Sequence, residues 1–148
     1  MSDPGVIDAG VHRIRIRVYY EDTDAAGIVY HAAYLAFAER ARTEMLRCLG
    51  LDHGTLRARF GLTFAVRRCS IDYRAPGRLD DLLEIQTRMV RRGGASLELE
   101  QQVLRGAQLL TRLDVRLALV GADLRVARLP HQLIGAFDRL HAPAQGAA

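Results

Sequence analysis

A chain of 148 residues with 49% hydrophobic and 26% charged side chains has the size and composition of one globular domain. No apolar run approaches the roughly 20 residues that cross a bilayer, and the first residues lack the layout of a secretory signal, so neither a membrane-spanning nor a secreted protein is expected. With only two cysteines, Cys48 and Cys69, there is no disulfide framework, which predicts a reducing, cytoplasmic location.

The net charge is +4, and all 21 basic residues are arginine, because the chain contains no lysine. The arginines run from Arg13 to Arg139 without a dense patch and without interleaved aromatic residues. This distribution is typical of a solvated basic surface and argues against a nucleic-acid-binding protein. Because guanidinium groups pair well with phosphate and carboxylate, an anionic small molecule is the next candidate partner.

The chain begins with residues 1–10, which we expect to form a loose leader. From Val11 the apolar residues alternate with arginines, and this period of two predicts a half-buried strand. The apolar face of this strand comprises Ile14, Ile16, Val18 and Tyr20.

A long helix is predicted from Ala32 to Leu49, where apolar residues recur at helical spacing and Gly50 can end the helix. The apolar positions are Tyr34, Ala38, Ala41, Met45 and Leu49. A short helix over residues 55–59 is expected to follow.

Four strands are then predicted, each by alternation or by β-branched and apolar content, and a short closing helix is expected over residues 130–140. The strands are expected at Thr63–Tyr73, Asp81–Arg92, Ser96–Leu104 and Leu109–Val120, connected consecutively by hairpins. This order predicts a single α+β domain over residues 1–148, with loose ends at about 1–10 and 141–148. In it, an antiparallel sheet of about five strands curves around one long helix.

Several common catalytic systems are absent from the sequence. None of the three serines lies in a Gly-x-Ser-x-Gly elbow, and the histidines and cysteines show no zinc-binding spacing. Gly93-Gly94 is typical of a hairpin turn and not of a phosphate-binding loop. Redox and nucleotide-hydrolysing chemistry therefore have no support in the sequence.

The remaining candidate is an acidic turn between the first strand and the long helix. Asp24 is followed by Ala-Ala-Gly, a turn that can aim the carboxylate into a cleft, while the helix start offers free N–H groups and the positive end of a dipole. A base or nucleophile that faces such an oxyanion site suits acyl transfer. Alternatively, Asp24 is a structural turn residue, as Glu21 and Asp22 are expected to be, or a metal ligand together with Asp22 and His31.

The segment Val18 to Ala32, with Tyr34-Leu35 and Glu39 to Glu44, resembles the hotdog-fold acyl-CoA thioesterases. The closest similarity is to the YbgC-like, tol-pal-associated branch of the 4-hydroxybenzoyl-CoA thioesterase family. It continues through Phe64 to Arg68, Asp72-Tyr73-Arg74-Ala75-Pro76, Leu79 to Asp81 and Leu83 to Thr87, and covers residues 12–137.

This resemblance implies a hotdog fold and a role for Asp24 as nucleophile or general base, with the backbone N–H of His31 in the oxyanion site. It also implies substrate contacts for Tyr30, Ser96, Arg91 and Arg92. The resemblance requires no metal and no retained cofactor, because coenzyme A is part of the substrate.

Three further expectations concern individual residues and partners. Glu39 is expected to be structural, and Ala33 stands where relatives often carry Asn. The resemblance implies a homodimer or homotetramer acting on acyl-CoA, or on acyl-carrier protein thioesters. The alternatives are a non-hydrolytic acyl-CoA, acyl-carrier-protein or cell-envelope interaction protein, and, less well supported, a hotdog dehydratase or isomerase.

Overall fold

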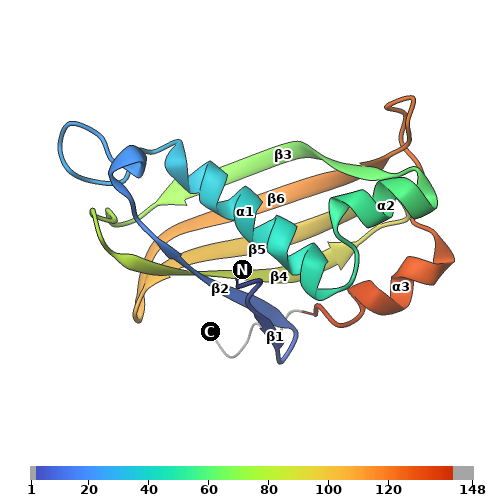
Figure 1. Ribbon diagram of the computed structural model, residues 1–148, viewed down its shortest axis with the longest axis horizontal. Helices are drawn as coiled ribbons and strands as arrows, with labels where there is room; N and C mark the ends of the chain where they lie inside the picture. The colour runs from blue at the N-terminus through green and yellow to red at the C-terminus, as the bar shows by residue number, and fades with distance from the viewer. Residues whose placement is uncertain (1–2, 142–148) are drawn as a thin grey trace.

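A curved antiparallel sheet and one long helix dominate the computed structural model, which describes residues 3–141 (Figure 1). The strands are β1 (Val6–Asp8), β2 (Val11–Arg17), β3 (Thr63–Tyr73), β4 (Leu82–Arg92), β5 (Ser96–Arg105) and β6 (Gln108–Val120). The helices are η1 (Tyr20–Asp22), α1 (Ala33–Cys48), α2 (His53–Phe60) and α3 (His131–Phe137). The predicted α+β class is confirmed, and the ends of the four predicted strands after the long helix are shifted by at most one residue.

The order of strands across the sheet is β1-β2-β4-β5-β6-β3. The prediction that all four later strands are consecutive hairpins is wrong for β3, which pairs with β6 instead of β4. The connection from β3 to β4 is too long for a tight hairpin, and its end is bonded to the residue after β2: Val18 donates to the carbonyl of Asp81 at 2.9 Å and accepts from Asp80 at 3.0 Å. These bonds place β4 beside β2 and leave β3 at the sheet edge.

A sixth strand, β1, lies where a loose leader was predicted. It forms a hairpin with β2, in which Asp8 pairs with Val11. The two turn residues, Ala9 and Gly10, have φ of 51° and 81°, the left-handed pair that matches the twist of a two-residue hairpin. Because alanine rarely adopts this conformation, the sequence did not predict the turn.

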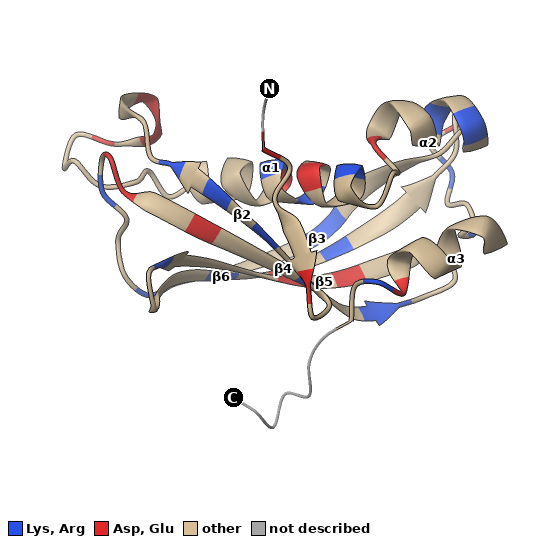
Figure 2. Ribbon diagram, turned by 60° about the horizontal axis from the view of Figure 1, so that its bottom comes forward, with Lys and Arg blue, Asp and Glu red and all other residues tan. Residues whose placement is uncertain are grey.

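Helix α1 packs its predicted apolar stripe against the concave face of the sheet (Figures 1 and 2). Ala38 and Ala41 are fully buried, because their small side chains allow the helix to approach the strands closely. The side chain of Gln101 on β5 donates to the carbonyl of Ala38 at 3.0 Å and to Oγ1 of Thr87 at 2.9 Å. The depth of α1 is therefore fixed by both packing and a buried hydrogen bond.

The predicted apolar face of the first strand is buried at Ile14, Ile16 and Val18 but not at its last position. Tyr20 was predicted on the buried face of the first strand, but it lies in η1 and is 83% exposed. The strand ends at Arg17, and the chain then turns into the acidic loop, so the alternation stops after Val18. Figure 2 shows arginines spread over strands and helices with acidic residues among them.

The pH dependence of stability is predicted to follow His12, whose side chain is buried in β2. Its Nε2 lies 2.7 Å from the carbonyl oxygen of Pro4, and Nδ1 has no partner among the described residues. Burial lowers the pKa of His12 below its ordinary value of about 6.5. The neutral ring is thus favoured by folding, and we expect the free energy of unfolding to fall as pH drops below about 6.5, with a limiting slope of about 1.4 kcal/mol per pH unit.

Urea unfolding between about pH 7.5 and 5 measures this slope. The variant His12→Gln can keep a donor toward Pro4 but cannot titrate, so its slope should be smaller. Asp52 and Asp81 also have lowered pKa values, but their contributions are lost only as the pH falls below the ordinary range of aspartate. Equal slopes in the wild type and the variant would contradict the assignment to His12.

Candidate active site

Asp24 begins a tight turn in the loop between η1 and α1. Its carbonyl accepts from Gly27 at 3.0 Å, and its N–H donates to the carbonyl of Ile28 at 2.9 Å. Its Oδ1 accepts from the N–H of Ala26 at 2.8 Å, whereas Oδ2 has no hydrogen-bond partner among residues 3–141. Asp24 is exposed and does not cap the helix, so one carboxylate oxygen holds the turn and the other is available.

The start of α1 presents backbone donors without acceptors. Its N-cap is Ala32, which has no side chain able to accept a hydrogen bond. The N–H of Ala33 donates to Tyr30 at 2.8 Å, whereas the N–H groups of His31 and Ala32 have no acceptor among the described residues. Since the helix is 16 residues long, its dipole adds to the attraction of these donors for negative charge.

Two tyrosine side chains hold this helix start against the segment after β3. The hydroxyl of Tyr73 donates to the carbonyl of His31 at 2.8 Å. The hydroxyl of Tyr34 accepts from the N–H of Gly77 at 3.0 Å, and the carbonyl of Gly77 accepts from Val29 at 2.8 Å. Burial raises the pKa of Tyr73, which keeps the phenol in its donor form.

The carboxylate and the helix start line one pocket of about 480 Å³, here named the Asp24 pocket. Asp24, His31 and Tyr73 contribute its polar surface together with Arg74, whose Nε is paired with Asp72 at 2.9 Å. The remaining lining is mainly apolar and includes Ile28, Val29, Ala75 and Pro76. Such a pocket can hold an acyl group beside a carboxylate and the first residue of the helix start, His31.

The other predicted site residues lie elsewhere in the single chain. Tyr30 is 47% exposed, and its ring packs against that of His31 with centroids 4.3 Å apart. Ser96 pairs with Ala118 on β6, whereas Tyr73 pairs with Thr111 on the same strand, so Ser96 and the Asp24 pocket are about 23 Å apart along the sheet.

Arg91 and Arg92 end β4 at the same end of the sheet as Ser96. Arg92 is paired with Asp138, the residue after α3, at 3.7 Å, whereas Arg91 forms no ion pair with the described residues. One copy of the chain therefore does not bring Ser96 or these arginines to Asp24.

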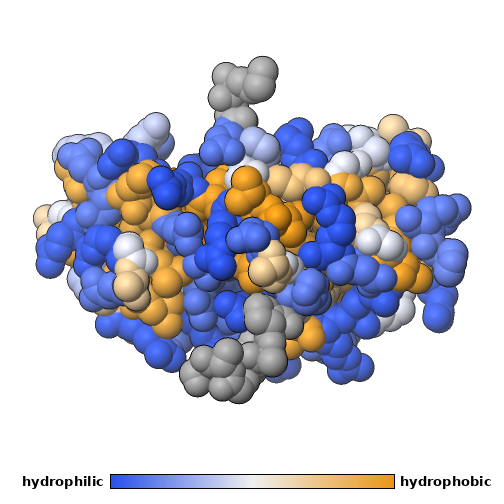
Figure 3. All heavy atoms as spheres, turned by 90° about the horizontal axis from the view of Figure 1, so that it is seen from below, coloured by the Kyte–Doolittle hydropathy of each residue, from blue (hydrophilic) through white to orange (hydrophobic). Residues whose placement is uncertain are grey.

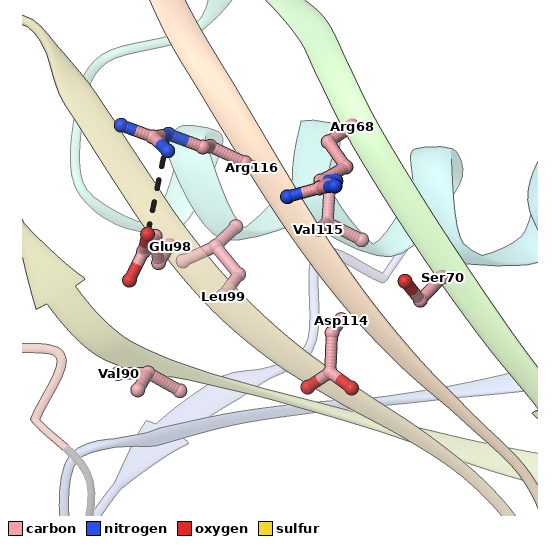
Figure 4. A pocket seen from close by; sticks show the side chains of 8 residues that line it. All are labelled: Arg68, Ser70, Val90, Glu98, Leu99, Asp114, Val115 and Arg116. Carbon is pink, nitrogen blue, oxygen red and sulfur yellow. Dashed lines mark ion pairs between the residues drawn. The ribbon is translucent and has the colours of Figure 1, made fainter.

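Another pocket, with a volume of about 180 Å³, lies on the face of the sheet opposite α1. Figure 4 shows the side chains that line it. It lies among Arg68, Ser70, Glu98 and Asp114, and Arg116 is paired with Glu98 at 4.0 Å. No helix residue is among the described residues that line this pocket, so these residues do not provide the helix-start donors that acyl transfer needs.

Asp22 uses its carboxylate to accept from the N–H of Tyr19 at 2.8 Å, which is a structural role in the turn. Among residues 3–141, no three His, Cys, Asp or Glu side chains are placed to hold a metal ion.

None of the described helices is both long and apolar enough to cross a membrane. On the face of the molecule shown in Figure 3, hydrophilic residues surround smaller apolar areas.

The roles of Tyr34 and Tyr73 were not predicted from the sequence. Tyr34 was assigned to the buried face of the helix, and Tyr73 to the end of a strand. The Tyr73 hydroxyl reaches a carbonyl 42 residues away, so no local pattern could reveal the bond. The available signal was the Asp72-Tyr73-Arg74-Ala75-Pro76 segment, which belonged to the family resemblance without an assigned role.

Both the sequence and the fold of this chain are similar to those of known thioesterases. The profile of the thioesterase superfamily matches residues 26–111. Acyl-CoA thioesterase YbgC of Haemophilus influenzae is 42% identical over 126 residues, which cover 84% of this chain and 93% of that protein. Acyl-CoA thioester hydrolase YbgC of Escherichia coli O6:H1 is 44% identical over the same coverage.

The crystal structure of a probable thioesterase from Bartonella henselae superimposes with a TM-score of 0.78. It is 40% identical in sequence, and the match covers 81% of this chain and 99% of that one. The hotdog fold predicted from the resemblance is confirmed.

The bond between Tyr34 and Gly77 can be tested by replacing Tyr34 with Phe. This change leaves the buried N–H of Gly77 without an acceptor, and we expect it to lower the free energy of unfolding by about 1–3 kcal/mol. Tyr20→Phe is the control, because Tyr20 is exposed, and it should change stability by less than about 0.5 kcal/mol. Urea unfolding measures both; a Tyr34→Phe protein as stable as the control would contradict the role of the hydroxyl.

Proposed function

Because this chain belongs to the thioesterase superfamily and is a thioester hydrolase, we propose that it hydrolyses acyl-CoA in the Asp24 pocket. The observation that carries the proposal is the placement of a carboxylate with one available oxygen in the same pocket as His31 at the helix start, where backbone donors lack acceptors. A thioester is already activated, so a base or nucleophile and an oxyanion site can suffice without a serine triad.

In this mechanism, the thioester carbonyl oxygen accepts from the N–H of His31, and the N–H of Ala32 is a second available donor. Asp24 either removes a proton from the attacking water or attacks the carbonyl carbon itself, giving an anhydride that water then opens. In both routes the C–S bond breaks, sulfur leaves with its electron pair and takes up a proton, and oxygen from water ends in the carboxylate. The helix start stabilises the negative charge that develops on the carbonyl oxygen.

The tyrosine contacts support the proposal because they fix the donors before substrate binds. An oxyanion site is effective when its dipoles need no reorganisation during the reaction. Tyr73 holds the carbonyl of His31, and the Tyr34–Gly77 bond holds the first turn of α1. These bonds support the proposed role of the His31 N–H, because they hold the residue that would donate to the carbonyl oxygen.

The exposed edge of β3 supports a homodimer as the basic unit, with a homotetramer as an assembly of two dimers. This edge strand has 11 residues, and Val66 and Tyr73 on it are 53% and 46% exposed. A long, unprotected edge favours pairing with another strand. Antiparallel pairing of two β3 strands would set the Asp24 pocket of one copy beside the opposite end of β3 in the other.

Such a dimer would also bring the end of the sheet that carries Ser96 closer to the second copy's Asp24 pocket, as substrate contacts there require. Arg91 forms no ion pair with the described residues and is the better placed of the two arginines for coenzyme A phosphates, because Arg92 is drawn to Asp138. Coenzyme A is then substrate and not a retained cofactor. The cytoplasmic location and acyl-carrier protein thioesters remain predictions.

The experiment that tests the proposed function is free-thiol release from a panel of acyl-CoAs, with wild type beside Asp24→Asn. We expect the variant to fold and its turnover to fall by on the order of 10³ or more, because amide replaces the carboxylate that acts on the thioester. Glu21→Gln is the matched control, since Glu21 is an exposed acid three residues earlier, and it should retain turnover. Near-wild-type activity of Asp24→Asn would remove Asp24 from the mechanism.

Tyr73→Phe tests whether the clamp on His31 matters for turnover. Loss of the 2.8 Å bond should lower kcat by about 10-fold while KM changes little, because the oxyanion donor becomes less well positioned. Steady-state kinetics and thermal unfolding of this variant should be compared with those of Tyr20→Phe. An unchanged kcat, or a kcat loss fully explained by unfolding, would show that Tyr73 has only a structural role.

A further inference from the structure

A second cavity lies between α1, α2 and the first half of β3, and the proposed mechanism does not use it. Its volume is about 250 Å³. A cavity of about 150 Å³ can take up benzene, so this one has room for a short acyl chain or a single ring. Its apolar walls are formed by Leu46, Phe64, Val66 and Leu117.

One side of this cavity is polar and carries a positive charge. Arg42 of α1 lines it, and Nη1 of Arg42 donates to Oε1 of Gln101 at 2.8 Å. The amide group of Gln101 cannot rotate by half a turn without losing its hydrogen bonds to Ala38 and Thr87. Its oxygen is therefore held toward the guanidinium of Arg42. The remaining guanidinium donors are free to bind a ligand, because no other hydrogen bond of this side chain is made within residues 3–141.

Arg42 also forms no ion pair within the described part of the chain. Elsewhere, Arg88 and Arg112 share Glu100 at 3.6 and 2.9 Å, but Arg42 forms no such pair. Burial lowers the pKa of Arg42, and Glu39 only partly offsets this effect. Glu39 lines the same cavity but is exposed, so water screens its charge.

An anion fits this cavity better than a neutral polar group. A partly buried cation without a partner is unfavourable, and a carboxylate can supply both the missing charge and acceptors for the guanidinium fork. A hydroxyl would supply hydrogen bonds but leave the charge uncompensated. Thr43 and His53, whose Oγ1 and Nε2 are 3.3 Å apart, add two polar groups that can orient the bound end of a ligand.

The cavity can communicate with the Asp24 pocket across the proposed dimer. Phe64 and Val66 lie near the start of β3, whereas Tyr73 at its end lines the Asp24 pocket. Because antiparallel pairing reverses the strand, the cavity of one copy would adjoin the Asp24 pocket of the other in the proposed dimer. An acyl group held at one helix start could then extend into the cavity of the second copy.

We propose that this cavity receives the far end of an acyl group whose thioester lies in the Asp24 pocket, and that Arg42 selects acyl groups ending in a carboxylate, so that the preferred substrates are dicarboxylic acid monothioesters of coenzyme A. The inference rests on the proposed thioesterase function and adds the class of its substrate. Arg42 is the specificity-determining residue, while Asp24 and the helix start perform the hydrolysis.

The test compares matched substrates that differ only in the terminal group: glutaryl-CoA with pentanoyl-CoA, and adipoyl-CoA with hexanoyl-CoA. Free-thiol release gives kcat/KM for each, after subtraction of the enzyme-free rate, because a terminal carboxylate can attack its own thioester. We expect wild type to favour the carboxylated member of at least one pair by about 10-fold or more. Arg42→Gln should reduce that ratio by about 10-fold or more, and Arg40→Gln, an exposed arginine on the same helix, should leave it unchanged.

Arg42→Lys, which keeps the charge and loses the fork, should give an intermediate ratio. If Arg42→Gln does not fold, the kcat/KM ratios of the wild type and of Arg42→Lys still test the proposal. Preference of the wild type for the neutral acyl-CoAs in both pairs, or an equal ratio in wild type and Arg42→Gln, would overturn the proposal. So would a change of oligomeric state in Arg42→Gln without a change of ratio, because Arg42 would then serve contact between copies. Hydrolysis of the neutral substrates alone overturns this inference but not the thioesterase function, whereas absence of hydrolysis of every acyl-CoA would count against both.

Discussion

The close approach of α1 to the sheet determines where the rest of the molecule can lie. Ala38 and Ala41 are fully buried, and the amide of Gln101 bonds the carbonyl of Ala38. A larger side chain at either alanine would push the helix away and break that bond. Because the helix lies at this depth, its first turn reaches the segment after β3, and its middle reaches the cavity that Arg42 lines.

The start of the same helix has backbone N–H groups that no side chain caps. Most helix starts satisfy their N–H groups with a capping side chain, but Ala32 provides none. The carbonyl of His31 is instead held by the hydroxyl of Tyr73. The fold thereby gives up some local stability, and in the proposed mechanism the uncapped N–H groups are the donors to the oxyanion.

Local sequence patterns were sufficient for most of the fold and for the position of Asp24. Helical spacing located α1, alternation located β2 and the later strands, and the acidic turn before a glycine marked the candidate carboxylate. The β1 hairpin was missed because its Ala9-Gly10 turn has no usual turn sequence, and the place of β3 was missed because strand order depends on long-range pairing. The role of Tyr73 depends on a bond to His31, 42 positions away in the sequence, and that of Arg42 on a bond to Gln101, 59 positions away. A local sequence pattern cannot predict such bonds.

The most direct test of the account is a structure of the protein bound to an acyl-CoA analogue in which a methylene group replaces the thioester sulfur. We predict that the ketone oxygen lies about 3 Å from the backbone nitrogen of His31, with the carboxylate of Asp24 facing the carbonyl carbon directly or through one water. A ketone placed away from the helix start, for example on the outer face of the sheet beside Arg68 and Asp114, would contradict the assignment of the site.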